Sequence, residues 1–216
     1  MKQTILSLFI LGLVACTPQH NTETASSVET AASSQVTPTD AADWVLEKAN
    51  ITFTSTKADT QSNQIKEDGL FTAYSGHLDK QGNFNMQIDL SSADTDIAIR
   101  DQRIKEWLFE TDKFAQARIQ ATLDPEVINK LDINQKITLE QPLSLNIRGK
   151  QVKLNSTLDV TRTSTHTISV VTTKPVELDI TKFGMSDGLV RLKEVMGLSD
   201  ISYIVPVNFQ GDFKRP

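Results

Sequence analysis

Cysteine and histidine are scarce in this chain, which has one cysteine and three histidines among its 216 residues. A single cysteine cannot form an intramolecular disulfide. The histidines, His20, His77 and His166, are far apart in the sequence, whereas a metal site needs ligands that cluster. The composition therefore argues against a disulfide-stapled fold and against a metal centre.

A surplus of basic residues is also missing. Lysine and arginine number 22 against 27 aspartates and glutamates, so the formal net charge is -5. Because nucleic-acid binding requires a basic face that neutralises phosphates, we expect no nucleic-acid partner. The chain also lacks the glycine-rich loops that cradle phosphates. We therefore expect no cofactor.

A hydrophobic run long enough to span a bilayer is absent, but a shorter one opens the chain. Lys2 precedes the apolar run Ile5–Val14, whose length of about ten residues suits a signal peptide. The tetrapeptide Leu13–Cys16, LVAC, resembles the bacterial lipobox, in which the cysteine is acylated and becomes the new N-terminus. We expect residues 1–15 to be a lipoprotein signal peptide and Cys16 to be the lipid anchor. An ordinary secretory signal is the alternative.

Aromatic residues are missing from the segment that follows. Residues 16–42 are mostly Thr, Ser, Ala, Gln and Glu, which bury too little apolar surface to offset their ordering entropy. This composition predicts a disordered tether between the membrane and a domain over residues 43–216. Thr17 stands where inner-membrane lipoproteins commonly carry an aspartate. We therefore expect a location in the cell envelope, on the outer membrane facing the periplasm.

Alternation of apolar and polar residues is the dominant pattern of the domain. Phe84–Leu90, FNMQIDL, places every second residue on one apolar face, and Val152–Val160 repeats the pattern. Such alternation is typical of antiparallel strands with one buried face. Gly82 and Gly149 mark hairpin turns between such runs. The pattern predicts about eight strands, which start near Trp44, Ile65, Phe84, Arg118, Ile137, Val152, Thr167 and Ile201.

Helical patterns are few and short. Ile104 and Leu108 share a helical face, Asp124 and Pro125 open a second short helix, and Leu189–Met196 carries a third apolar stripe. Two or three short helices among mostly sequential antiparallel strands favour an all-β barrel or sandwich. The strand number favours the closed barrel, since about eight strands enclose a space that side chains fill or that holds one slender ligand.

Five segments carry a resemblance to a known family. They are WVLEKANITF, GLFTAYSGHL, DLSSADTDIAIRDQRIKEWLF, LSLNIRGKQVKL and FGMSDGLVRLKEVMGLSDISYIVPVNF. In this order they resemble the YceI-like family of exported lipid-binding proteins, and the family's recurrent G-x-F falls on Gly69 and Phe71. The resemblance implies an extended lipocalin-like antiparallel barrel that holds a polyisoprenoid chain lengthwise in its lumen. The family often has a histidine shortly after the first strand, where this chain reads TSTKAD.

An isoprenoid tail has no hydrogen-bonding groups, so its site needs only a dry, elongated cavity lined by aromatic and branched side chains. Inward positions of the alternating strands supply such side chains, although plain core packing is the alternative at each position. The candidate lumen residues are Phe53, Phe71, Phe84, Met86, Ile88, Leu145 and Phe209.

The stretch Gly184–Gly188, GMSDG, matches the G-x-S-x-G motif of serine hydrolases and makes Ser186 a candidate nucleophile. In that motif's fold the histidine base follows the serine in the chain, but no histidine follows His166. We expect instead that the glycines permit a tight turn. Ser186 or Asp187 would then cap a helix that begins at about Leu189 and closes one end of the barrel.

These patterns together predict a membrane-tethered periplasmic protein that holds an apolar chain of the polyisoprenoid or isoprenoid quinone type. It would carry or store that lipid without catalysis. Two alternatives remain open, a lipid-ester hydrolase that uses Ser186 and a stress or assembly factor that binds protein partners through its rim. The identity of the lipid and the formation of a homodimer are also left open.

Overall fold

The structure is a computed structural model that describes residues 42–215. The predicted signal peptide, the anchor Cys16 and nearly all of the predicted tether lie outside these residues. Within residues 42–215, no helix combines the length and the hydrophobicity that crossing a membrane requires.

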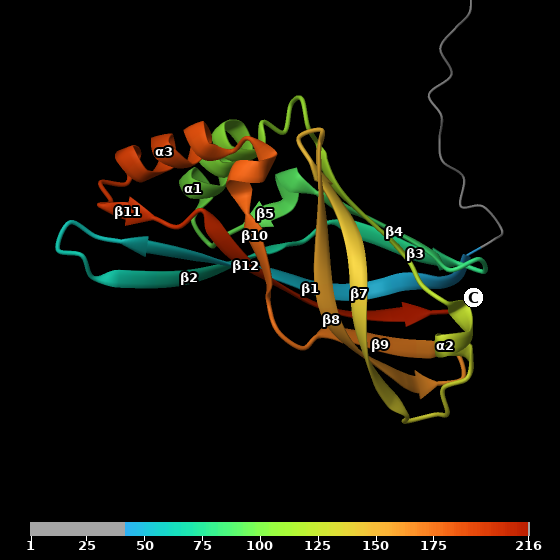
Figure 1. Ribbon diagram of the computed structural model, residues 1–216. Coiled ribbons are helices and arrows are strands. Elements are labelled where there is room, and N and C mark those ends of the chain that lie inside the picture. Colours follow the sequence, from blue (N-terminus) through green and yellow to red (C-terminus); the bar gives the residue numbers. More distant parts are fainter. Residues whose placement is uncertain (1–41, 216) are drawn as a thin grey trace, which may run out of the picture. The chain divides into compact units, whose positions relative to one another are not determined.

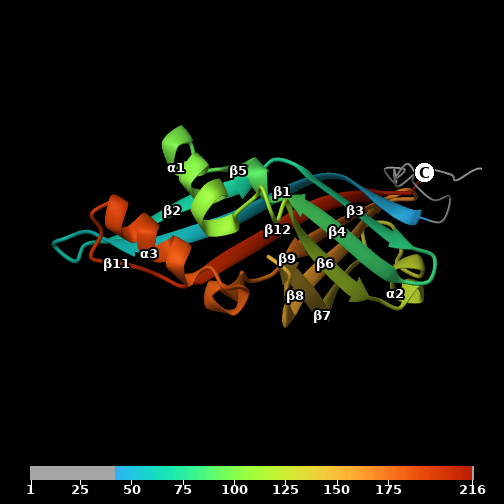
Figure 2. The ribbon, with the colours of Figure 1, turned by 90° about the horizontal axis from the view of Figure 1, so that it is seen from above.

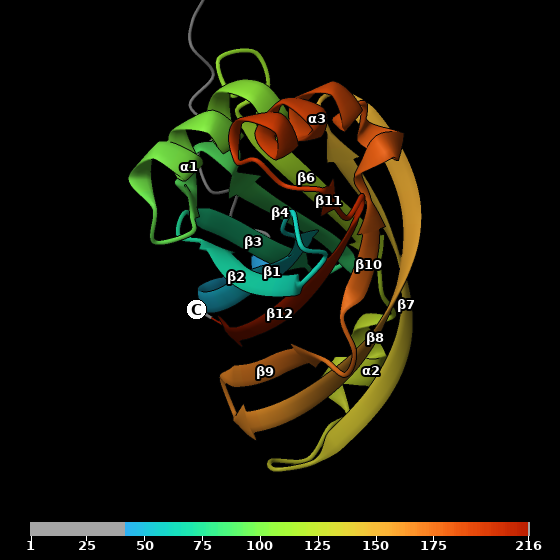
Figure 3. The same ribbon diagram turned by 90° about the vertical axis from the view of Figure 1, so that its left-hand side faces the viewer.

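Eight antiparallel strands of residues 42–215 close into a barrel (Figure 1). Each strand pairs with the next around the ring, and the last strand pairs back with the first, which forms the closed barrel that the strand number favoured. End-on, β7 and β8 curve around one side of the central axis (Figure 3). In order around the ring the strands are β1 (Ala42–Ala58), β3 (Tyr74–Asp79), β4 (Asn83–Asp89), β6 (Gln116–Thr122), β7 (Lys136–Ile147), β8 (Lys150–Ser164), β9 (Thr167–Thr172) and β12 (Ile204–Lys214).

The long strand β1 extends the barrel at one end. Its first residues pair with β3, whereas Ile51–Ala58 pair with β2 (Gln64–Phe71), which lies outside the ring. Three short strands complete this extension, namely β5 (Ala93–Asp94), β10 (Val176–Asp179) and β11 (Asp200–Ile201). The start predicted near Ile65 therefore belongs to the extension, and β3 takes its place in the ring.

Short helices cover the extended end. Helix α1 (Ala98–Arg103) continues into the π-helical turn η2 (Ile104–Phe109), and α3 (Ser186–Val195) packs against η2. Figures 1 and 2 show α1 and α3 at the end of the domain where the β1–β2 hairpin lies, with α2 (Pro125–Asn129) at the opposite end. Two 3-10 turns, η1 (Leu90–Ser92) and η3 (Ile180–Phe183), connect strands to these helices.

The predicted hairpins form where the glycines allow them. Gly82 and Gly149 have φ angles of 87° and 71°, a region that disfavours side chains. They join β3 to β4 and β7 to β8, respectively. The inward faces of these hairpins supply much of the apolar core, which includes Met86, Ile88, Leu145 and Ile147.

Candidate functional site

The barrel contains an elongated cavity of about 300 Å³. Each of the eight ring strands contributes inward side chains to its wall. These side chains are almost all aliphatic or aromatic, because every second residue of a strand points to the same face. The volume lies at the lower end of the range of about 300–1,000 Å³ for small-molecule sites.

All seven residues predicted from the alternation line this cavity. Met86, Ile88 and Leu145 are buried, and the four phenylalanines are half-buried. Their contact with a ligand stays a prediction. The seven are Phe53, Phe71, Phe84, Met86, Ile88, Leu145 and Phe209.

Aromatic rings gather in two groups along the wall. Near the helices, the rings of Phe53 and Phe71 lie 5.3 Å apart between centroids, and Phe71 lies 6.1 Å from Phe109 of η2. Separately, Phe84 of β4 packs edge-on against Phe213 of β12 at 6.0 Å. Such spacings are typical of favourable aromatic pairs. The two groups give the cavity flat, rigid walls made from strands that are distant in sequence.

Trp44 supports the cavity wall at the start of β1. Its side chain is 1% exposed, and the guanidinium of Arg215 stacks over the indole ring at 4.4 Å from the centroid. Trp44 lines the cavity and also belongs to the main hydrophobic core.

Comparison with protein families matches residues 44–213 to the YceI-like domain. The chain belongs to the YceI-like family. This confirms the family resemblance in the sequence. A comparison with curated proteins gives no match.

Two solved structures show the same fold as this YceI-like domain. A polyisoprenoid binding domain from Saccharophagus degradans, implicated in plant cell wall breakdown, aligns with a TM-score of 0.76 at 24% identity. That alignment covers 81% of this chain and 99% of the other. BcnA of Burkholderia cenocepacia aligns with a TM-score of 0.56 at 17% identity, covering 76% and 95% of the two chains. At these identities the likeness establishes the extended lipocalin-like barrel.

A charged cluster interrupts the apolar wall of the YceI-like domain at its helix-covered end. Oε2 of Glu67 on β2 accepts from both Lys57 Nζ on β1 and Arg100 Nη1 on α1. The side chains of Lys57 and Arg100 are only 6% and 14% exposed, against 39% for Glu67. The hydrogen bond from Lys57 is the main cause that holds the pKa of Glu67 below its ordinary value of 4.5, and Arg100 adds to it.

Arg100 is held by a neighbouring threonine. Its Nε donates to Thr95 Oγ1 at 2.8 Å, and its Nη2 donates to the Thr95 carbonyl at 2.7 Å. Asp101 accepts from the Thr95 backbone N–H at 3.0 Å, which fixes the loop before α1. The guanidinium is therefore fixed in orientation toward Glu67 and the cavity.

The sequence analysis did not identify Lys57 or Glu67 as site residues, although the alternation along β1 indicated that Lys57 points inward. Lys57 lies two and four residues beyond Ser55 and Phe53, so the alternation that turns Phe53 inward also turns Lys57 inward. Lys57 is the lysine of TSTKAD, where the family often has histidine. The meeting of Lys57 with Arg100 depends on tertiary structure.

The hydroxyl of Ser156 lies in the part of the cavity wall that β8 contributes. Ser156 of β8 is 4% exposed, and its Oγ has no hydrogen-bond partner within the described chain. Across the β7–β8 pair, Gln141 donates its amide to the carbonyls of Pro142, at 2.7 Å, and Thr122, at 3.3 Å. Ser156 thus carries the one unpaired buried hydroxyl among the described residues.

The GMSDG stretch forms a corner rather than the expected capped turn. Gly184, with φ of 71°, ends η3, and α3 begins at Ser186 instead of about Leu189. The N-cap is Met185, which makes no side-chain capping bond, so neither Ser186 nor Asp187 caps the helix. The expectation of a later start was wrong because the left-handed glycine lets the chain re-enter a helix within two residues.

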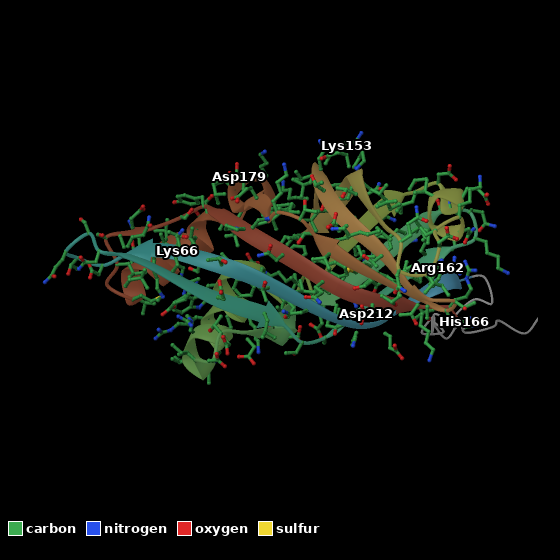
Figure 4. All side chains as sticks on the ribbon, turned by 90° about the horizontal axis from the view of Figure 1, so that it is seen from below. Lys66, Lys153, Arg162, His166, Asp179 and Asp212 are labelled. Atoms are coloured by element: carbon green, nitrogen blue, oxygen red, sulfur yellow. The ribbon has the colours of Figure 1, made fainter. Side chains whose placement is uncertain are left out.

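Ser186 has none of the partners that a nucleophile needs within the described residues. Its hydroxyl makes no hydrogen bond there, and His77 and His166 are exposed on β3 and on the β8–β9 turn. Figure 4 places His166 near Arg162, at the end of the domain opposite Lys66. Residues 42–215 contain no cluster of three potential metal ligands.

Proposed function

We propose that this protein binds one long apolar chain of the polyisoprenoid or isoprenoid quinone type in its lumen and carries or stores it unchanged. The observation that most directly supports this proposal is the elongated cavity, whose wall is apolar along nearly its whole length. The similar domain from Saccharophagus degradans is described as polyisoprenoid binding. Family membership and the chemistry of the wall therefore point to the same class of ligand.

The affinity would come from surface burial rather than from polar recognition. Transfer of apolar surface out of water contributes about 25 cal/mol per Å², so a slender hydrocarbon gains in proportion to the length enclosed. Phenylalanine rings and Met86 adapt well to a branched chain, since flat and flexible side chains fill irregular gaps. The lumen would thus select for chain shape and length.

The surroundings of Ser186 favour a non-catalytic role over ester hydrolysis by this serine. Acyl transfer by a serine requires a general base within hydrogen-bond reach, commonly a histidine oriented by an acid. Ser186 instead opens helix α3. We therefore favour carriage or storage over ester hydrolysis.

Attachment to a membrane is the second part of the proposal. The lipobox-like LVAC favours acylation at Cys16, and Thr17 favours the periplasmic face of the outer membrane. Acyl chains contribute about 0.8 kcal/mol per buried methylene, so a multiply acylated cysteine would be stably attached. Metabolic labelling with palmitate and membrane fractionation test this. Label retained in Cys16→Ser, or a soluble wild-type protein, would contradict it.

Lipid extraction tests whether the lumen holds a lipid and of which class. The protein, expressed in its native host, is extracted with organic solvent, and the extract is analysed by mass spectrometry. We expect a long prenyl chain in the extract, because the wall of the lumen is apolar.

A matched pair of variants locates the lipid. Ala117 faces the cavity and is 2% exposed, whereas its neighbour Gln116 is exposed on the outer face of β6. Ala117→Phe would fill the lumen and lower the lipid yield, and Gln116→Phe would leave it unchanged. A wild-type protein that consistently returns no lipid would refute the carrier function.

A further inference from the structure

The outer face of the helices that cover the lumen carries exposed apolar side chains. Ile97, just before α1, and Ile99, in its first turn, are 45% and 54% exposed. Val195, in the last turn of α3, is 46% exposed. These three residues do not line the cavity, whereas Leu189 and Leu192 of α3 do. The helices therefore bury one face against the lumen and present a second apolar surface to the outside.

Two arginines of different helices converge on one tryptophan at this surface. The guanidinium of Arg103 on α1 lies 5.6 Å from the centroid of the Trp107 ring, and that of Arg191 on α3 lies 4.4 Å from it. Ile99 precedes Arg103 by four residues, which is about one helical turn. Val195 follows Arg191 by the same interval. We call these five residues, Ile99, Arg103, Trp107, Arg191 and Val195, the helix patch.

The two arginines of the helix patch have no anionic partner in the part of the chain that the structure describes. Neither guanidinium forms an ion pair or a hydrogen bond there, although Asp187 lies one turn before Arg191 on α3. Like charges that converge on one ring repel each other unless an anion lies beside them. Guanidinium groups bind phosphate through paired hydrogen bonds and can stack on an aromatic ring as well. The helix patch is therefore complementary to a phosphate that adjoins an apolar surface.

This combination of side chains matches the interfacial region of a phospholipid bilayer. Tryptophan is enriched at the level of the headgroups, and basic residues accompany apolar ones on helices that lie in the interface. A soluble phosphate would engage the arginines but would leave Ile99 and Val195 exposed to water. Exposed apolar side chains that adjoin polar ones mark an interaction surface. A bilayer therefore accounts for both halves of the helix patch.

The predicted tether is long enough for the helix patch to reach the membrane that holds the anchor. Strand β1 starts at the end of the domain opposite α1 and α3 (Figure 1). Its 17 residues span about 56 Å at ~3.3 Å per residue. Residues 16–41 have a maximum reach of about 85 Å at the ~3.3 Å per residue of an extended chain. The tether therefore exceeds the distance that separates its attachment point from the helices.

We propose that the helix patch docks onto a bilayer that contains anionic phospholipid. The two arginines bind headgroup phosphates, and the side chains of Ile99 and Val195 enter the interface beneath them. Docking places the covered end of the lumen, where α3 packs against η2, against the membrane. The inference concerns the outer face of the helices and goes beyond the proposed function, because it holds whatever the lumen contains.

Quenching of tryptophan fluorescence by brominated acyl chains tests the docking, since bromine quenches only nearby indole rings. The full chain, purified from its host, is mixed with vesicles of brominated phosphatidylglycerol and phosphatidylethanolamine, and the vesicle-bound fraction is collected by flotation. Trp107 should be quenched, whereas Trp44, which is 1% exposed, should not. The chain has two tryptophans, so Trp107→Phe separates the two signals and should remove the quenching.

Matched variants assign the docking to the helix patch. Ile99→Asp places a carboxylate at the interface and should abolish most of the quenching. Val127→Asp is its control, because Val127 is 37% exposed on α2 at the opposite end of the domain. Arg191→Gln should lower the docking equilibrium constant, read from the quenched fraction, about fivefold. Lys80→Gln, at an exposed site between β3 and β4, should leave it unchanged. Thermal melts verify that each variant is folded.

Three outcomes would overturn the docking. The first is quenching that persists in Trp107→Phe, or that is equal in Ile99→Asp and wild type. The second is quenching by zwitterionic phosphatidylcholine vesicles that equals the quenching by anionic ones, a comparison that needs no variant. The third is displacement by soluble glycerol phosphate, which would indicate a site for a small anion. Absence of the protein from the vesicle fraction would overturn the docking together with the membrane anchor, whereas lipid extraction tests the lumen independently.

Discussion

Gly188 of α3 lies directly against the main-chain carbonyl of Trp107 in η2, so close that an added Cβ would come within 3.0 Å of that oxygen. A carbonyl oxygen cannot rotate away as a side chain can. We therefore expect Gly188→Ala to push α3 off η2 and to lower the free energy of unfolding by about 1–3 kcal/mol. Thermal denaturation would show a fall of about 2–4 °C per kcal/mol for a domain of this size.

Ser186→Ala is the control for that change, because Ser186 lies in the first turn of the same helix and its hydroxyl makes no hydrogen bond within the described chain. Its stability should stay within about 0.5 kcal/mol of wild type. A comparable loss in both variants would mean that the helix, rather than the Gly188 contact, is sensitive. The same variant should also leave any background ester turnover unchanged.

The ring of Phe53 occupies the space above Gly69. A Cβ at Gly69 would come within 3.0 Å of that ring and of the Asp94 carbonyl. Gly69→Ala should therefore displace the ring into the lumen and reduce the amount of lipid extracted per protein. Gly76→Ala is the milder comparison, since its nearest neighbour, Leu46, would lie at 3.3 Å. Equal lipid yields from both variants would argue against a ligand beside Phe53.

The lowered pKa of Glu67 predicts a loss of stability in acid. Its pKa lies below the ordinary 4.5 because of the bonds from Lys57 and Arg100. The resulting stabilisation is complete above that ordinary value and is lost as the pH falls through the lower pKa of the folded state. Glu67→Gln should flatten the decline of unfolding free energy below pH 4.5, measured by urea denaturation. Glu177→Gln, at an exposed site without an ion pair in residues 42–215, should keep the wild-type decline.

The Ser156 hydroxyl is buried without a hydrogen-bond partner in residues 42–215, so we expect its removal to raise the stability of the protein. An unsatisfied buried polar group costs about 1–3 kcal/mol, so Ser156→Ala should stabilise the lipid-free protein by about 1 kcal/mol. Ser144→Ala is the control, because Ser144 accepts from Gln151 Nε2 at 2.6 Å and should show no gain. Urea denaturation of the three proteins decides this. A destabilised Ser156→Ala would mean that the hydroxyl has a partner such as an internal water.

The alternation of the strands was sufficient to identify the inward residues of the barrel. Phe53 and Met86, for example, line the cavity because a period of two assigns each to a face whatever strand lies beside it. Local turn chemistry likewise located the hairpins at Gly82 and Gly149. These features depend on a few neighbouring residues, which is why a single sequence suffices.

Contacts between segments that are distant in the sequence could not be predicted from these local patterns. The ring closes because β1 pairs with β12, at the other end of the domain, and no local pattern states that partner. Arg100 meets Glu67 from 33 residues away, so the charged cluster exists only once α1 is packed over β2. The hollow lumen is also a tertiary property, since the same inward residues could have filled it.

Arg148 links the β7–β8 turn to the end of η2 and to the start of α3, at the covered end of the lumen. We therefore expect a substitution of Arg148 to change the rate at which lipid exchanges. Its guanidinium donates to Glu110 at the end of η2 and to the carbonyl of Gly184 just before α3. Arg148→Lys keeps the charge, but a single ammonium cannot reproduce the planar fork that reaches both acceptors. We expect α3 to separate more often from η2, and a bound fluorescent lipid to transfer to acceptor vesicles several-fold faster, at similar equilibrium affinity. Lys150→Met, an exposed change two residues further along the same hairpin, should leave the rate unaltered. An unchanged rate in Arg148→Lys would indicate that lipid leaves by a route that does not require α3 to move.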